Sequence, residues 1–211
     1  MSGAQAEIWE RYAAKYTPRR AVNAAGATTW LNWTQYPDHG PDETVLGDLR
    51  GKRVLELGSG AGANLAHLAT LGAVCTGIDI APSRAGLARQ AWGHLGRLEF
   101  VTADVLGYLT DTNIMFDVVY SIFGAVWFTD PEALFPLVRM RMSHGGVFAF
   151  SQSPATAQEN ETGQIVRQRH LPVHQWIEQL TATGFREIVA ETIDAPELGK
   201  PGTVLVHARA A

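Results

Sequence analysis

Residues 54–62 read Val-Leu-Glu-Leu-Gly-Ser-Gly-Ala-Gly, an apolar run that passes into three glycines at alternate positions. The apolar run predicts a buried strand. The glycines predict a tight turn after it, because a residue without a Cβ lets the backbone turn sharply and lets a ligand approach closely. Leucines at helical spacing follow within residues 61–71, so a helix should begin beside the turn. Its N-terminal N–H groups favour an anionic or carboxylate-bearing ligand at this point.

The rest of the chain repeats this alternation of short apolar strands with helices. Further strands are expected at 73–80, 98–105, 116–123 and 145–151, and further helices at 83–95, 131–142 and 172–183. Such alternation indicates a parallel sheet covered on both faces. A final pair of strands, 185–193 and 202–210, is joined by too few residues for a crossover helix and should be antiparallel. The fold class is therefore α/β with an open, doubly wound sheet, which binds ligands beyond the carboxyl ends of its strands.

The region before this core has a different pattern. Residues 4–16 place Ile8, Trp9, Tyr12 and Tyr16 at helical spacing, and a proline at position 18 ends the pattern. A second short helix is expected at 43–49. We predict that residues 1–50 form an N-terminal helical cap, or lid, within the same domain as a core of residues 51–211.

Composition limits the classes of protein to consider. The 211 residues include 17 basic and 21 acidic side chains, a net charge of −4, and 46% are hydrophobic, which is typical of one globular domain. This balance argues against a nucleic-acid groove, and no apolar run is long enough to span a membrane. The one cysteine, Cys75, excludes an internal disulfide and a cysteine-rich zinc site. We expect a soluble, cytoplasmic protein without a metal.

Three acidic residues lie where the strands should end. Asp79 follows Gly58 by 21 residues and could accept hydrogen bonds from ribose hydroxyls. Glu56 lies inside a buried strand, where an unpaired carboxylate would cost several kcal/mol. It should therefore face the ligand cleft, where an ammonium group could pair with it. Asp104 ends the third strand and could accept a hydrogen bond from an adenine amino group.

A dinucleotide-binding site is the main alternative. Gly58, Gly60 and Ala63 match the spacing of the glycine motif that binds NAD or NADP, although such a match alone is weak. The two additional acids, Glu56 and Asp104, suit a compact cofactor with a cationic end better. In addition, no second domain remains for the substrate of a hydride transfer.

The motifs together resemble the class I S-adenosylmethionine-dependent methyltransferases, in particular those that act on small molecules. The resemblance rests on VLELGSGAG, GIDIAPS, FVTAD, FDVVYSIFGAVWFTDPEAL and MSHGGVFAFS, in this order and spacing, and covers the chain from about Gly51 to its end. It implies a Rossmann-like sheet of seven strands with the last strand antiparallel. It also implies S-adenosyl-L-methionine as the cofactor.

The resemblance implies roles around the methionine end of that cofactor. Glu56 would orient this end through a backbone or water-mediated hydrogen bond. The backbone of Gly58, Ser59 and Gly60 would approach the methionine portion. Ser121, just past the fourth strand, would lie near the amine.

The other implied roles concern the nucleoside. Asp79 would hold the ribose, with Ile80 against the adenine. Asp104 and the Val105 amide would contact the adenine edge. Tyr16 would cover the cofactor from the N-terminal lid, although this helix could equally be an amphipathic helix that only packs on the sheet.

Candidate residues for the methyl acceptor are less defined. His170, just before the helix expected at 172–183, is the candidate general base, because many relatives place substrate-facing residues there. Phe123 and Trp127 follow the fourth strand and favour an apolar substrate pocket. Trp30 and Trp33 could belong to the same pocket or to the core.

The leading hypothesis is a methyltransferase that acts on a small, fairly apolar natural-product or metabolic intermediate. O-methylation is slightly favoured, because it is common among small relatives and because a histidine base could serve it. Two alternatives remain at this point: an NAD(P)-dependent oxidoreductase with a Rossmann fold, and a non-catalytic cofactor-binding subunit of a methyltransferase assembly. No nucleic-acid or membrane partner is expected, and the sequence does not determine the oligomeric state.

Overall fold

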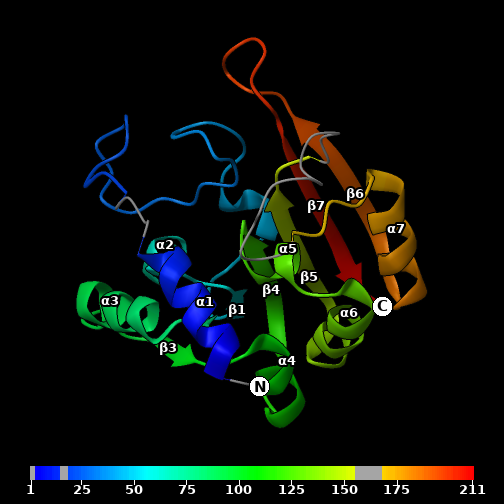
Figure 1. The fold of residues 1–211 in the computed structure, drawn as a ribbon, viewed down its shortest axis with the longest axis horizontal. Helices are drawn as coiled ribbons and strands as arrows, with labels where there is room; N and C mark the ends of the chain where they lie inside the picture. The colour runs from blue at the N-terminus through cyan, green and yellow to red at the C-terminus, as the bar shows by residue number, and fades with distance from the viewer. Residues whose placement is uncertain (1–2, 15–18, 155–167) are drawn as a thin grey trace.

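A computed structural model describes residues 3–14, 19–154 and 168–211. Its centre is a seven-stranded sheet in the order β3-β2-β1-β4-β5-β7-β6 (Figure 1). The pairs from β3 through to β5 are parallel, whereas β7 runs antiparallel to both β5 and β6. The predicted fold class, with its antiparallel last strand, is confirmed.

Most elements lie within a few residues of the predicted ranges. The strands are β1 Arg53–Leu57, β2 Val74–Asp79, β3 Leu98–Thr102, β4 Phe116–Ile122, β5 Met142–Gln152, β6 Phe185–Ile193 and β7 Thr203–Ala210. The helices are α1 Gly3–Ala13, α2 Ala63–Thr70, α3 Pro82–Trp92, α4 Val105–Asp111, α5 Ala125–Phe128, α6 Pro131–Met140 and α7 Val173–Ala182, together with a 3₁₀ helix, η1, at Glu43–Leu46.

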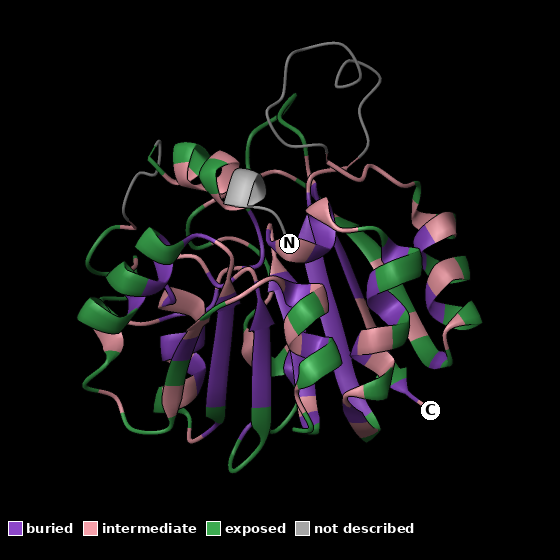
Figure 2. Cartoon of the chain, turned by 60° about the horizontal axis from the view of Figure 1, so that its bottom comes forward, coloured by how far each residue is buried: buried purple, intermediate pink, exposed green. Residues whose placement is uncertain are grey.

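The sheet separates two hydrophobic cores. Helices α2 and α3 pack on one face together with the segment around Trp33, and α4, α6 and α7 pack on the other. Side chains alternate along β1, so Val54 faces the first core, whereas Leu55 and Leu57 face the second. The central strands are buried along most of their length (Figure 2). This double cover leaves the ends of the strands as the place for a ligand.

The structure differs from the predictions in its short helices. Helix α1 ends at Ala13, and η1 is shorter than the helix expected at 43–49. Helices α4 and α5 were not predicted, because they have only seven and four residues, too few for a periodic pattern to show. The Asp104 side chain caps α4 by accepting a hydrogen bond from the Gly107 N–H at 3.0 Å.

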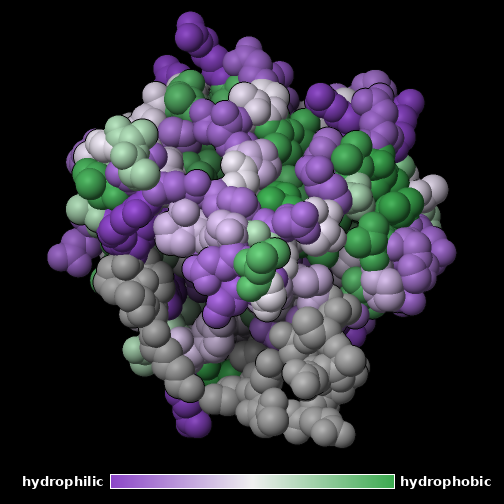
Figure 3. Space-filling view, turned by 90° about the horizontal axis from the view of Figure 1, so that it is seen from above, coloured by the Kyte–Doolittle hydropathy of each residue, from purple (hydrophilic) through white to green (hydrophobic). Residues whose placement is uncertain are grey.

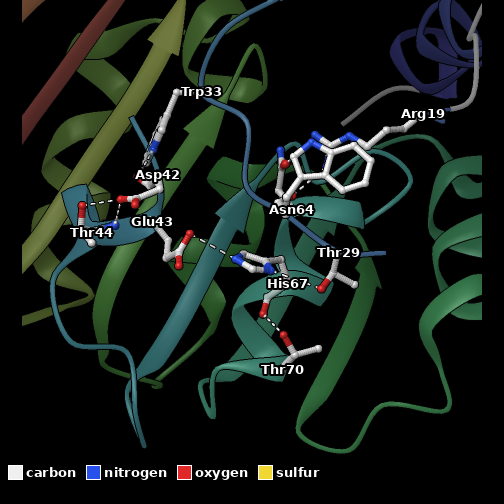
Figure 4. A network of polar contacts seen from close by, with 10 residues as sticks. Arg19, Thr29, Trp33, Asp42, Glu43, Thr44, Asn64, His67 and Thr70 are labelled. Carbon is white, nitrogen blue, oxygen red and sulfur yellow. Dashed lines mark hydrogen bonds and ion pairs between the residues drawn. The ribbon is translucent and has the colours of Figure 1, made fainter. Parts of the chain in front are cut away.

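Polar contacts attach the N-terminal segment to α2 (Figure 4). Arg19 Nη2 donates to Asn64 Oδ1 at 2.7 Å, and His67 pairs with Glu43 at 3.2 Å. The Trp33 indole N–H donates to the Asp42 carbonyl at 3.0 Å and so fixes the start of η1. These contacts join the segment to α2, and Arg19 lies at a cavity beyond β1 and β2.

The loops after β1 and β4 touch each other through glycines. Gly58 has φ of +80°, and a Cβ on it would lie 2.5 Å from the Ala125 nitrogen and 3.0 Å from Gly124 Cα. A Cβ on Gly124 would in turn lie 2.5 Å from the Leu57 carbonyl oxygen. Only glycine at both positions lets the two central strands end side by side.

We expect Gly58→Ala to destabilise the protein more than Gly51→Ala. Both glycines have left-handed φ, which costs about 1–2 kcal/mol for alanine, but a Cβ at Gly51 would meet nothing within 4 Å. The collision at Gly58 should add about 1–3 kcal/mol. Urea unfolding of the two variants measures the difference, and equal losses would mean that the two loops separate at little cost.

Candidate functional site

A cavity of about 520 Å³ lies at the carboxyl ends of β1, β2 and β4. Its walls come from the glycine loop after β1, the acidic residues that end the strands, and the loop after β4. Trp9, Tyr12 and Ala13 of α1 also line it. In Figure 2, α1 lies across the upper ends of the buried strands. The cavity is therefore located where an open, doubly wound sheet binds its ligands.

The glycine loop is held against the end of β2 by backbone hydrogen bonds. The N–H groups of Gly58 and Ser59 donate to the Ile78 carbonyl at 2.8 and 2.9 Å. The Gly60 N–H donates to Asp79 Oδ2, also at 2.8 Å. A Cβ on Gly60 would meet nothing within 4 Å, so the backbone there borders open space. The loop is thus rigid at its base and leaves room for a ligand above it.

Asp79 connects this loop with the start of α3. Its second oxygen, Oδ1, accepts a hydrogen bond from the Ala81 N–H at 2.9 Å. Burial raises the pKa of Asp79, whereas the two backbone hydrogen bonds and the charge of Arg84 oppose that rise. Each carboxylate oxygen can accept a further bond, so the group can also receive two hydroxyl groups of a ligand.

Glu56 lies at the bottom of the cavity with 2% of its surface exposed. It pairs in register with Tyr120 of β4, on the sheet face that carries α2. Among the described residues, Glu56 Oε2 has no hydrogen-bond partner. Burial raises the pKa of Glu56 to about 8, although the Tyr120 hydroxyl and the charge of Arg19 favour its ionised form. A cationic group in the cavity would therefore stabilise the ionised form of Glu56.

Arg19 and Asn64 complete this end of the cavity, and the sequence analysis missed both. Arg19 donates to Asn64 Oδ1 and, at 2.9 Å, to the Trp30 carbonyl (Figure 4), and its guanidinium lies 4.7 Å from the centre of the Trp30 ring. Arg19 is one of two adjacent arginines after a proline and belongs to no recognised motif, so no signal in the sequence marks it. Arg19 and Glu56 thus place one basic and one acidic side chain at this end of the cavity.

The other end of the cavity contains the residues predicted for the nucleoside. Ile80, Asp104 and Val105 all line it. The Asp104 carboxylate already accepts a hydrogen bond as the cap of α4. Tyr16, the predicted lid residue, lies outside the described residues.

Five other predicted residues are not among those that line the cavity: Ser121, Trp30, Trp33, Trp127 and His170. Ser121 is buried and donates to the Leu57 carbonyl at 2.8 Å, so it joins the ends of β4 and β1. Trp33 is fully buried in the core against Tyr120, because its large apolar surface fills the space under the N-terminal segment. Trp30 lines a separate hollow of about 320 Å³ next to Arg19.

Aromatic rings form a continuous row beside the cavity. Phe123 and Phe128 line it, whereas Trp127 packs against both, with ring centres at 5.7 and 5.2 Å. Trp9 of α1 meets Phe128 edge-on at 4.7 Å. Trp9 and Tyr12 belong to the predicted lid helix, but the sequence did not assign their side chains to the site. These aromatic rings make this wall apolar.

His170 lies on the far side of this aromatic row. Its ring meets that of Trp127 edge-on at 5.5 Å, and its Nε2 lies 3.0 Å from Gln168 Oε1. His170 is not among the residues that line the cavity described above. In the part of the chain that the structure describes, no group of three potential metal ligands occurs, and no helix is long and apolar enough to cross a membrane.

Comparisons with known proteins agree with this geometry. A family model described as a methyltransferase domain matches residues 54–146, which include the glycine loop, Asp79 and Asp104. No curated protein matches the chain in sequence.

Solved structures share the fold at low sequence identity. An S-adenosylmethionine-dependent methyltransferase from Mesorhizobium loti has 22% identity and a TM-score of 0.61, over 79% of this chain and 94% of that one. DhpI, solved with S-adenosylhomocysteine, has 24% identity and a TM-score of 0.61, over 78% and 79% of the two chains. The 1,6-didemethyltoxoflavin N1-methyltransferase of Burkholderia thailandensis has 21% identity and a TM-score of 0.60, over 77% and 72%.

The family model identifies a methyltransferase domain within residues 54–146, and the solved structures show the shared fold. The matched residues include the glycine loop and the acids that border the cavity. The chain thus contains a match to a methyltransferase domain and has the fold of S-adenosylmethionine-dependent methyltransferases of known structure.

Proposed function

We propose that this enzyme methylates a small, fairly apolar molecule, with oxygen as the favoured acceptor atom. The observation that carries the proposal is one cavity in which a polar end, formed by Glu56 and Arg19, adjoins an aromatic wall. An aromatic wall suits an apolar acceptor, since it gains free energy by burying apolar surface. One structural neighbour, the Burkholderia enzyme, was solved with a small acceptor bound.

The residues of the cavity fit S-adenosylmethionine as the cofactor. Glu56 would hold its ammonium group and Arg19 its carboxylate, because these two side chains lie together at one end. Asp79 would accept the ribose hydroxyls, and Asp104, with the Val105 amide, would contact the adenine beside Ile80. The orphaned oxygen of Glu56 is the structural observation that favours a cationic group here.

The chain's own residues then position the reactants. The cofactor supplies a methyl group on a positively charged sulfur, which an acceptor displaces in line. Correct placement provides most of the rate acceleration in such a displacement. The rigid glycine loop and the aromatic wall would fix the two reactants, and α1 would exclude water through Trp9 and Tyr12. A hydroxyl acceptor must also lose a proton, for which we propose His170 as general base.

A direct screen tests the proposed function. The full chain is incubated with methyl-tritiated S-adenosylmethionine and pools of small phenols, alcohols, amines and thiols, and the label in each pool is measured after extraction. Label in the phenols or alcohols supports the proposal. Label confined to amines or thiols contradicts the preference for oxygen, and label in none of the pools, with cofactor binding demonstrated, contradicts a small acceptor of these classes.

Asp79→Asn should weaken binding of S-adenosylhomocysteine by roughly 10–100-fold, as for loss of charge-assisted hydrogen bonds. The matched control is Asp117→Asn, because Asp117 also accepts a backbone hydrogen bond, from Arg53 at 2.9 Å, at a distance from the cavity. Isothermal titration of both variants gives the affinities. Equal affinities for the two variants would place the ribose elsewhere.

Arg19→Met should weaken S-adenosylhomocysteine binding by about tenfold or more, since the carboxylate loses its charged partner. Binding of 5′-methylthioadenosine, which lacks the amino-acid end, should not change. The control is Arg20→Met, because the neighbouring Arg20 pairs with Asp38 and does not line the cavity. A similar loss for both ligands would mean that Arg19 supports the fold of the loop instead.

His170→Gln should slow methyl transfer to an acceptor found in the screen by about 10²–10⁴-fold and leave cofactor affinity unchanged. His174→Gln, at an exposed position one turn further on, is the control. Full activity of the His170 variant would exclude it as the base. A loss shared by both variants would indicate a disturbed α7.

A further inference from the structure

Glu56 is a buried carboxyl group that forms no ion pair with a described residue. It lies in a central strand. Removing an ionised carboxylate from water without pairing it is costly enough that such a group normally takes up a proton instead. Glu56 nevertheless lines the ligand cavity.

The groups that face Glu56 do not neutralise it. From β4, the Tyr120 hydroxyl stands beside it in register, and from β2, Cys75 lies on the same face. Burial raises the pKa of Tyr120 well above its ordinary value and that of Cys75 to about 12, so both stay uncharged at neutral pH. Asp79 adds a negative charge that further disfavours ionisation of Glu56.

Arg19 is the one positive group that favours the ionised form of Glu56 among the described residues. Its guanidinium is engaged with Asn64, the Trp30 carbonyl and the Trp30 ring. The net effect of all these groups still raises the pKa of Glu56 to about 8, with burial as the largest cause. Burial therefore favours the protonated form of the carboxyl group in the ligand-free protein.

We propose that Glu56 gives up this proton when a ligand with an ammonium group binds, so that about one proton leaves the protein for each such ligand. The proposal rests on the proposed place of the cofactor's amino-acid end. The ammonium of the ligand forms an ion pair with the carboxylate, the proton passes to the buffer, and no other bond changes. The buried acid thus makes the site selective for a ligand that carries this charge.

Proton release is measured by isothermal titration of the full chain with S-adenosylhomocysteine at pH 6.5, in buffers with different ionisation enthalpies. The observed enthalpy should vary with the buffer by an amount that corresponds to nearly one released proton. With 5′-methylthioadenosine, which has neither ammonium nor carboxylate, it should not vary. The affinity for S-adenosylhomocysteine should rise roughly tenfold per pH unit below about pH 8.

Glu56→Gln is the matched variant, since it has the shape of the protonated acid but cannot ionise. Its proton release should vanish, and its affinity for S-adenosylhomocysteine should fall by about tenfold. Its affinity for 5′-methylthioadenosine should stay the same. Release that persists in this variant would assign the proton to another group and overturn the proposal.

The ligand-free protein provides a second readout. As pH rises from about 4.5 to about 8, native Glu56 holds a proton that the unfolded chain has already lost, so the free energy of unfolding should fall. The decrease over this window should be smaller in Glu56→Gln. If that variant does not fold, the comparison of proton release with the two ligands on the natural chain still tests the proposal.

The outcomes separate this proposal from the proposed function. Binding of S-adenosylhomocysteine without proton release would overturn the role of Glu56 alone and leave methyl transfer in place. Equal release with both ligands would also overturn it, because 5′-methylthioadenosine brings no ammonium group. Absence of any binding of S-adenosylhomocysteine would overturn both.

Discussion

The pairing of β1 with β4 in the middle of the sheet determines where this protein binds its ligand. The chain leaves β1 towards α2 on one face, whereas it leaves β4 towards α5 and α6 on the other. The two loops therefore diverge and leave a crevice between them. Gly58 and Gly124 let the loops touch at its base. The acids that end β1, β2 and β3 all reach this one space.

The cavity combines three kinds of environment along its length. One end has the buried Glu56 with Arg19, the middle has Asp79 with the glycine loop, and the other end has Asp104. Polar groups that are fixed by backbone hydrogen bonds need not reorganise when a ligand arrives. Beyond the acids lies the aromatic wall. On the face seen from above, hydrophobic and hydrophilic residues are interspersed (Figure 3).

The position of an acid along its strand indicated where its side chain lies. Glu56, Asp79 and Asp104 were assigned to one site because parallel strands end at the same edge, and all three line the cavity. The sequence left open those side chains that had two possible surroundings. Trp33 could be pocket or core, and it is core, because Ser151 and η1 hold its backbone and indole over the sheet. Periodicity predicts that a side chain is buried, but it does not predict which residues that side chain packs against.

The sequence by itself determined the succession of the strands and the longer helices along the chain, the glycine turn and the acids at the strand ends. These features depend on short-range patterns and on the rule that parallel strands share an edge. Only the tertiary structure decided that Arg19 joins Glu56, 37 positions away in the sequence, and that Trp9 of α1 meets Phe128. Such contacts depend on how the N-terminal segment folds back over the sheet, and side-chain packing between distant segments decides that.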